Sequence, residues 1–174
     1  MNPNIYAIIF CRTRRETQEV ADNLIKDGYS ADSLHGDLSQ AQRDSVMGKF
    51  RKKTIQILVA TDVAARGLDV SELTHVINHK LPDQIENHTH RSGRTGRAGR
   101  SGEAILFIAP REKRMLSSIE RATGQTIERM AIPSATDINQ IRVDQFKKSI
   151  LDRLENNNIS FFQSIFVTSI TLTN

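Results

Sequence analysis

Short apolar runs alternate along the chain with stretches that repeat apolar side chains at helical spacing. Buried strands are predicted over residues 5–11, 29–34, 55–60, 75–79 and 103–109, with a shorter sixth strand over 127–132. Helices are predicted over residues 14–27, 40–51 and 111–123, and another begins at Pro82-Asp83. Strands separated by helices are typical of an α/β fold with a parallel sheet and helices on both faces.

Short polar motifs mark where two of these helices begin. Thr13 has the side chain of a helix N-cap, and Gly28 suits the position just past the end of the same helix. Ser39-Gln40-Ala41-Gln42 has the pattern of a capping box at the start of the next helix. The side chains predicted to face the core are Val20, Ala21, Leu24 and Ile25 in the first helix and Val46, Met47 and Phe50 in the second.

The alternation of strands and helices stops after Pro133. Apolar side chains at roughly helical spacing then predict one long amphipathic helix, and these are Ile138, Ile141, Phe146, Ile150 and Leu154. We therefore expect a domain over residues 1–132 and a C-terminal extension over residues 133–174. Two alternatives stay open for the helix, which either packs onto the domain or forms an interface with a second chain. Residues 159–174, apolar and rich in Ser and Thr, are interpreted as a strand or a poorly packed tail.

Composition indicates the cellular compartment and the kinds of partner that the protein can have, but it does not indicate the function. Lys and Arg outnumber Asp and Glu by 24 to 20, which is compatible with a nucleic-acid partner without proving one. No apolar run approaches the roughly 20 residues of a membrane span, and the start lacks the basic region of a secretory signal. The only cysteine, Cys11, excludes an intrachain disulfide and a Cys-based zinc site, and its apolar neighbours indicate a buried core position. We expect a cytoplasmic protein with no membrane partner and no metal site of its own.

A basic tract over residues 90–100 carries the most specific chemistry. Arginine recurs at every third position, as Arg91, Arg94, Arg97 and Arg100, with glycines between them. Guanidinium groups match phosphate oxygens, and glycine lets the backbone approach an anion closely. Such a cluster can stabilise the charge of a transferring phosphoryl group. The alternative is a solvated basic tract that binds nucleic acid loosely or acts as a targeting signal; the position between a helix and a strand favours the first interpretation.

Two further polar segments directly follow predicted strands. In residues 60–69, the Thr61 hydroxyl and nearby backbone N–H groups can hold a phosphate, and Asp69 can accept from a ribose hydroxyl or pair with Arg66. The simpler alternative there is a capped turn with an internal Asp–Arg pair. After residues 35–37, Gln40 and Arg43 share one helix face, which either reaches a nucleic-acid backbone or is simply solvated.

Together these segments resemble the second, C-terminal RecA-like half of a bacterial DEAD-box ATP-dependent RNA helicase, a member of superfamily 2. The matching segments are residues 8–13 (motif IV), 40–43 (motif IVa), 60–69 (motif V), 76–82, and 90–97 (motif VI). The resemblance covers about residues 1–132 and implies a RecA-like parallel sheet. His79-Lys80 stand where Tyr-Asp is frequent, His88 where Tyr is frequent, and Ser92 where Ile or Val is frequent. These departures concern the coupling between sites and not the family.

The resemblance implies a role in ATP binding for four residues. Arg94 and Arg97 would be arginine fingers on the γ-phosphate of ATP. Asp69 would contact the ribose, and Gly67 would belong to the same nucleotide-binding segment.

It also implies contacts to RNA. His90 and Arg91 would couple the nucleotide site to the RNA site or to the other half of the helicase. The residues implied to contact the sugar-phosphate backbone, without reading bases, are Thr13, Gly36, Gln40, Arg43 and Thr61. RNA strands would separate by local bending of a duplex held between two closed halves.

Half of the expected machinery is missing from the chain. The sequence has no Gly-x-x-x-x-Gly-Lys-Ser/Thr loop for phosphates, no Asp-Glu-Ala-Asp box for Mg²⁺ and no Ser-Ala-Thr motif. In the family these lie on the N-terminal RecA-like domain, which is therefore the expected partner and the holder of Mg²⁺. We expect this chain alone not to hydrolyse ATP.

Two other functions remain open at this point. One is a non-catalytic RNA-binding or dimerising module from a truncated helicase, with the helix at residues 136–156, in the C-terminal extension, as the interface. The other is a DNA helicase of the same superfamily, whose members also end this domain with Gly-Arg-x-Gly-Arg. The full tract over residues 90–97 favours the RNA branch.

Overall fold

The computed structural model describes residues 5–68, 70, 73–96 and 102–155. The predicted strand or tail over residues 159–174 lies outside these ranges. The chain divides into two compact units, residues 1–127 and residues 128–174, and each is described by itself.

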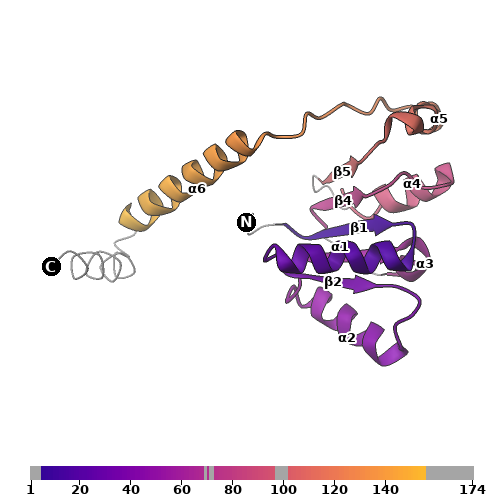
Figure 1. The fold of residues 1–174 in the computed structure, drawn as a ribbon, viewed down its shortest axis with the longest axis horizontal. Coiled ribbons are helices and arrows are strands. Elements are labelled where there is room, and N and C mark those ends of the chain that lie inside the picture. The colour runs from indigo at the N-terminus through magenta and orange to yellow at the C-terminus, as the bar shows by residue number, and fades with distance from the viewer. Residues whose placement is uncertain (1–4, 69, 71–72, 97–101, 156–174) are drawn as a thin grey trace. The chain divides into compact units, whose positions relative to one another are not determined.

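The first unit is built on a parallel sheet in the order β2-β3-β1-β4-β5 (Figure 1). The strands are β1 (Ala7–Cys11), β2 (Ala31–Leu34), β3 (Ile57–Thr61), β4 (His75–Asn78) and β5 (Glu103–Leu106), and all neighbouring pairs are parallel. The helices are α1 (Arg14–Lys26), α2 (Gln40–Arg51), α3 (Asp62–Ala65), α4 (Ile85–Ser92) and α5 (Lys113–Thr123), with a 3₁₀ turn over Pro110–Glu112 before α5. This arrangement confirms the predicted α/β class.

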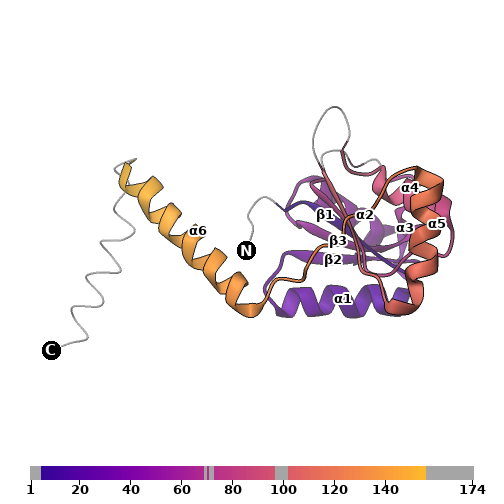
Figure 2. The ribbon, with the colours of Figure 1, turned by 90° about the horizontal axis from the view of Figure 1, so that it is seen from above.

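Side chains of the central strand β1 alternate between two cores, because successive residues of a strand point to opposite faces. Ile8 and Phe10 face one side, where they belong to a cluster with Val46, Met47 and Phe50 of α2. Ile9 and Cys11 face the other side, in a cluster with Ala21 of α1. Helices therefore cover both faces, and α1 is seen along one of them in Figure 2. Cys11 is 1% exposed, which confirms its predicted core position.

The predicted capping motifs form as the sequence indicates. The Thr13 hydroxyl accepts a hydrogen bond from the backbone N–H of Glu16 at 3.2 Å and caps α1. Ser39 and Gln42 cap α2 reciprocally, each side chain accepting from the other residue's backbone N–H, at 3.3 and 2.9 Å. Gly28 follows α1 with φ 81°, a left-handed conformation that favours glycine over residues with a Cβ atom.

Several predictions about elements are wrong or shifted. Residues 127–132 form no strand, and Met130 and Ile132 are 65% and 86% exposed. Their apolar side chains suggested a strand, but β-structure needs a neighbouring edge to pair with. Ile25, assigned to the buried stripe of α1, is 50% exposed. The helix expected from Pro82 begins at Ile85, and the strand expected to reach residue 109 ends at Leu106.

The second unit contains the predicted long helix, α6 (Ala135–Glu155). The Ser134 hydroxyl accepts from the backbone N–H of Asp137 at 3.1 Å, and the Asp137 carboxylate accepts from the backbone N–H of Ser134 at 2.9 Å. This reciprocal pair fixes the start of the helix after Pro133. Within the described ranges, no helix combines the length and the apolar character that crossing a bilayer requires.

We expect Phe50→Ala to destabilise the first unit strongly. Phe50 is fully buried, and its ring centroid lies 4.5 Å from that of Tyr6. Removing such a ring costs about 3–5 kcal/mol of the free energy of unfolding. Ile25→Ala, on the exposed side of α1, is the control and should cost within about 0.5 kcal/mol. Urea unfolding measures both values, and equal losses would contradict this assignment of the core.

Candidate functional site

The loops with candidate chemistry gather at one edge of the sheet. Because all five strands are parallel, their carboxyl ends share an edge. Arg12 and Thr13 follow β1, His35 and Gly36 follow β2, and α3 follows β3 directly. The strand ends thus bring together segments that are far apart in the chain.

Arg91 is the most deeply buried charged side chain at this edge, at 2% exposure. Its Nε and Nη2 donate to the two carboxylate oxygens of Asp62 at 2.6 and 2.7 Å. Its Nη1 donates to Asn78 Oδ1 at 2.7 Å and to the Lys80 carbonyl at 3.1 Å. The guanidinium also lies over the ring of Phe10, 5.0 Å from the centroid. One side chain therefore links α4 to α3 and to the ends of β1 and β4.

These contacts limit what Arg91 can do directly. Four of the five guanidinium N–H groups donate within the protein, so little capacity is left for an outside phosphate. Arg91 is a positioning residue in this structure. Its partners Asp62 and Asn78 were missed from the sequence, although both are polar residues at the junction of a buried strand with its following loop.

The segment after β3 begins with a capped turn. The Thr61 hydroxyl accepts from the backbone N–H of Ala64 at 3.3 Å and caps α3. Asp62, the first residue of α3, pairs with Arg91 of α4. The predicted pair of Asp69 with Arg66 cannot be placed, because residue 69 lies outside the described residues. Gly67 has φ 70°, so glycine is favoured there by backbone conformation, while the space around it is open.

A cavity of about 290 Å³ opens between these segments and α4. It is lined by Phe10, Asp62, Ala65, Arg66, Gly67, Asn87, His90, Arg91 and Arg94. The basic tract and the segment after β3, which are separate in the sequence, thus meet in one place. Three guanidinium groups and one carboxylate contribute to the lining, so the cavity is electropositive and suits an anionic group.

Arg94 is held at the wall of this cavity. Its Nη1 donates to the Leu68 carbonyl at 2.6 Å. The next residue, Thr95, donates from its hydroxyl to the Leu73 carbonyl at 2.5 Å and forms a parallel bridge with Leu73. A Cβ atom on Gly102 would lie 1.9 Å from Thr95 Oγ1, so this close approach requires glycine. The segment after α4 is therefore tied to the segment after α3. Two predicted residues of the site, Asp69 and Arg97, lie outside the described residues.

The five residues predicted to contact RNA fall into two neighbourhoods. Arg43, which is half-buried, donates to the Ala64 carbonyl at 2.5 Å, beside the cap made by Thr61. Gln40, one turn earlier on α2, is exposed and donates to Asp44 at 2.9 Å. The second neighbourhood carries Thr13 and Gly36.

In this second neighbourhood, side-chain contacts connect the start of α1 with the loop that follows β2. Arg14 forms an ion pair with Asp37, and its side chain lies beside Gly36, 3.8 Å from where a Cβ atom would stand. Thr13 and Gly36 are both exposed and therefore accessible to a ligand. The structure brings Thr13 near Gly36 and Arg43 near Thr61.

His88 is a buried histidine on α4. Its Nδ1 and the Oγ of Ser92, one turn later on α4, find no hydrogen-bond acceptor or donor among the residues that the structure describes. Burial, and secondarily the nearby positive charge of Arg91, lower the pKa of His88 from its ordinary value. His88 is therefore neutral in the folded state near pH 7.

A parallel sheet with an arginine-lined cavity at its carboxyl edge is the architecture of a RecA-like motor domain. A family model described as the helicase conserved C-terminal domain matches residues 2–99. A second, described as the RNA helicase DeaD dimerization domain, matches residues 133–169. The chain belongs to the helicase conserved C-terminal domain family, in its DEAD-box RNA helicase branch.

Two curated relatives are similar over nearly the whole chain. The ATP-dependent RNA helicase DeaD of Mycobacterium tuberculosis is 46% identical over 158 residues, which are 91% of this chain and 28% of the relative. The DEAD-box ATP-dependent RNA helicase CshA of Geobacillus kaustophilus is 47% identical over 157 residues, which are 90% of this chain and 34% of the relative. The chain thus spans about a third of the length of these relatives.

Two solved structures share the fold. A DEAD box protein from the hyperthermophile Methanococcus jannaschii is 48% identical, with a TM-score of 0.70 over 75% of this chain and 36% of that one. The E. coli DEAD-box protein SrmB, bound to the regulator of ribonuclease activity A, is 33% identical, with a TM-score of 0.71 over 75% of this chain and 78% of that one. These structures confirm the RecA-like fold.

We expect acid to destabilise the protein partly through His88. Its folded pKa lies below the ordinary value of 6.5, so the unfolded chain takes up the proton more readily as the pH falls below 6.5. The free energy of unfolding should therefore fall more steeply between pH 7 and pH 5 in the native chain than in His88→Gln. The other four histidines are common to both proteins and cancel in the difference. Urea unfolding across this range measures the two slopes, and parallel curves would contradict the prediction.

Proposed function

We propose that this chain is the second RecA-like half of an ATP-dependent RNA helicase. The observation that carries the proposal is the cavity between the segment after α3 and α4, which Arg66 and Arg94 line beside the internally paired Arg91. Guanidinium groups at such a place stabilise the charge of a transferring phosphoryl group. We propose Arg94 and Arg97 as arginine fingers on the γ-phosphate of ATP, with Gly67 and Asp69 in the nucleotide-binding segment.

The phosphates and Mg²⁺ would be held by an N-terminal RecA-like domain. This chain contains none of the motifs that cradle a nucleotide triphosphate, so its arginines can act only when another domain presents one. The hydrogen bond from Arg94 to the Leu68 carbonyl supports this interpretation, because a contact within the domain holds the guanidinium at the cavity wall. Binding of a phosphate there would need less ordering of this side chain.

RNA would bind along the carboxyl edge of the sheet through its sugar-phosphate backbone. Thr13, Gly36 and Gln40 are exposed and suited to direct contacts. Arg43 and Thr61 form hydrogen bonds with the backbone of α3. They would hold this segment in place beside the RNA, in addition to contacting the RNA themselves. His90, exposed in the cavity, and the buried Arg91 would couple the nucleotide to this edge and so to local unwinding of a duplex.

We also propose the setting of this function. The domain would end at residue 132, with an extension over residues 133–174, and the protein would work in the cytoplasm on RNA. Contacts to the backbone carry little base information, so the choice of RNA would come from elsewhere.

An ATPase assay tests the main proposal. The chain alone should not hydrolyse ATP, and adding the N-terminal RecA-like domain of the same helicase should give ATPase activity that RNA stimulates and DNA does not. Arg94→Ala should lower this rate about 10³-fold or more, because it removes a charge on the transition state. Arg15→Ala, which removes an exposed arginine of α1, is the matched control and should leave the rate unchanged.

Two results would contradict the proposal. One is ATP hydrolysis by the isolated chain that the Arg94→Ala substitution abolishes. The complete ATPase site would then lie within this chain. The other is full activity of the Arg94→Ala variant beside its N-terminal domain. Stimulation by DNA in place of RNA would instead support the DNA-helicase alternative.

The second unit supports a second proposal, a homodimer formed through residues 133–169. The match to a dimerisation domain covers this segment, and α6 exposes large apolar side chains. Ile141, Phe146 and Leu151 are 52%, 61% and 58% exposed. Exposed apolar side chains on one helix support the proposal that a second chain covers them.

We expect the chain to be a dimer in solution by size-exclusion chromatography with light scattering. Phe146→Glu should shift it toward the monomer, because it places a charge in the apolar interface. Gln145→Glu introduces the same charge at the neighbouring exposed position and should leave the dimer intact. A strict monomer at high protein concentration would contradict the proposal.

A further inference from the structure

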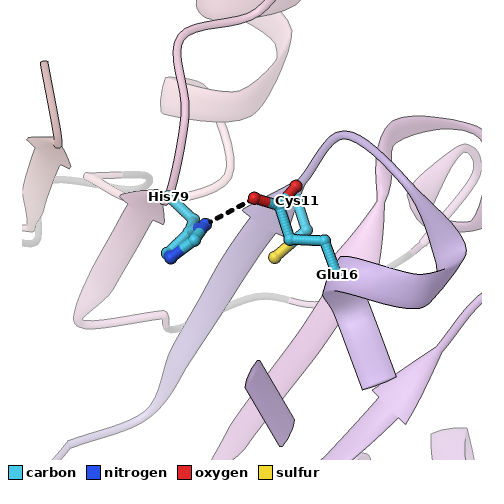
Figure 3. Close-up of side chains that lie close together, drawn as sticks. All are labelled: Cys11, Glu16 and His79. Carbon is cyan, nitrogen blue, oxygen red and sulfur yellow. Dashed lines mark hydrogen bonds and ion pairs between the residues drawn. The ribbon is translucent and has the colours of Figure 1, made fainter. Parts of the chain in front are cut away.

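Three side chains of types that bind metal ions lie together beside the carboxyl edge of the sheet, where RNA is proposed to bind. The proposed function uses none of them. Figure 3 shows Cys11 at the end of β1, Glu16 in the first turn of α1 and His79 after β4. The Cys11 sulfur, a Glu16 carboxylate oxygen and a His79 ring nitrogen all lie within 4.8 Å of one another. His79 Nδ1 is 3.0 Å from Glu16 Oε1.

We propose that Cys11, Glu16 and His79 form a binding site for a borderline-soft divalent cation, best matched by Zn²⁺. Thiolate, imidazole and carboxylate are the ligand types of zinc, whereas Mg²⁺ and Ca²⁺ prefer sites made of oxygens. In a tetrahedral zinc site the ligand atoms stand roughly 3.3–3.6 Å apart, given the usual zinc–ligand distances. The three ligand atoms, now within 4.8 Å of one another, would move closer by side-chain rotation when the ion binds, and the fourth position would be left for water.

The surroundings prepare Glu16 as an anionic ligand. Its second oxygen, Oε2, accepts a hydrogen bond from the backbone N–H of Arg12 at 3.0 Å, which fixes the carboxylate at the start of α1. Burial works against its charge, but hydrogen bonds from Lys80, from the Arg12 backbone and from His79 together lower the pKa of Glu16. The side chain of His79 is 37% exposed, so an ion can reach the site from solvent.

The thiol must lose its proton for the ion to bind. Burial, helped by the negative charge of Glu16, raises the pKa of Cys11 to about 12, so the group is a neutral thiol in the absence of a cation. The cation would replace that proton, and one proton would leave to solvent for each ion bound. His79 would coordinate through Nδ1 as the neutral ring, with its proton on Nε2.

Lys80 is the direct competitor for this site. Its Nζ lies 2.9 Å from the same oxygen of Glu16 and supplies the positive charge that a cation would bring. The Lys80 side chain is 45% exposed and can turn toward solvent. The other nearby cations are already paired, Arg12 with Asp83 at 3.2 Å and Arg91 with Asp62. Cation binding and the Lys80–Glu16 ion pair are therefore mutually exclusive.

Occupancy of the site would join three elements. The ion would connect the first turn of α1 to the ends of β1 and β4, which already lie side by side in the sheet. Thr13 caps the same turn of α1 that carries Glu16. The cation would thus fix the loop that presents Thr13.

Titration of the tag-free full chain with Co²⁺, a spectroscopic substitute for Zn²⁺, tests the proposal. We expect a thiolate-to-cobalt charge-transfer band together with the visible bands of a tetrahedral ion, and loss of both when Zn²⁺ displaces the cobalt. Zinc binding should also raise the melting temperature of the chain. Competition with a chromogenic chelator then gives the affinity for Zn²⁺.

Variants separate this site from adventitious binding. Cys11→Ala and His79→Tyr should each lower the Zn²⁺ affinity at least about tenfold. Lys80→Met keeps all three ligands, removes the competitor and should raise the affinity. Because Lys80 lies at the surface, this variant tests the proposal even if a buried substitution unfolds the protein.

Three outcomes would overturn the proposal. They are the absence of a charge-transfer band in the native chain, a Zn²⁺ affinity that Cys11→Ala leaves unchanged, and a Lys80→Met variant that binds no more tightly than the native chain.

Discussion

The geometry of the site depends on one buried ion pair, between Arg91 and Asp62. A guanidinium that is 2% exposed is stable only when its charge and its N–H groups are matched, and Asp62, Asn78 and the Lys80 carbonyl match them. Removing one partner of such a pair typically costs about 3–5 kcal/mol, because the other charge stays buried without compensation. The pair thus sets where α3 and α4 stand relative to the ends of β1 and β4, and so it shapes the cavity between them.

The parallel sheet explains why one edge carries all the candidate chemistry. Every strand delivers its following loop to the same side, so the arginine-lined cavity and the edge proposed for RNA lie within one domain. The two are mechanically connected, since Arg43 of α2 donates to Ala64 of α3, and Asp62 of α3 holds Arg91 of α4. A ligand that moves the cavity wall would therefore also act on the edge proposed for RNA.

Much of the fold was predictable because its signals are local. The caps at Thr13 and Ser39 need only residues within one helical turn, and the buried side chains of α2 follow from their spacing alone. The errors concern features that depend on distant neighbours. Residues 127–132 have apolar side chains suited to a strand but pair with no edge among the described strands, and Ile25 turned out to face solvent. Periodicity cannot show which sheet edge or helix face is left uncovered.

The sequence by itself determined the family, the α/β class and the arginine tract, because these depend on residue types at short spacing. Only the tertiary structure decided which residues meet. Asp62 binds Arg91, which lies 29 positions away in the sequence, and Glu16 binds His79, which lies 63 positions away. Both encounters follow from the strand order β2-β3-β1-β4-β5, which puts β1 next to both β3 and β4 although they are far apart in the chain. A single cysteine excluded a zinc site made of cysteines, but it could not exclude one completed by a glutamate and a histidine that the fold brings beside it.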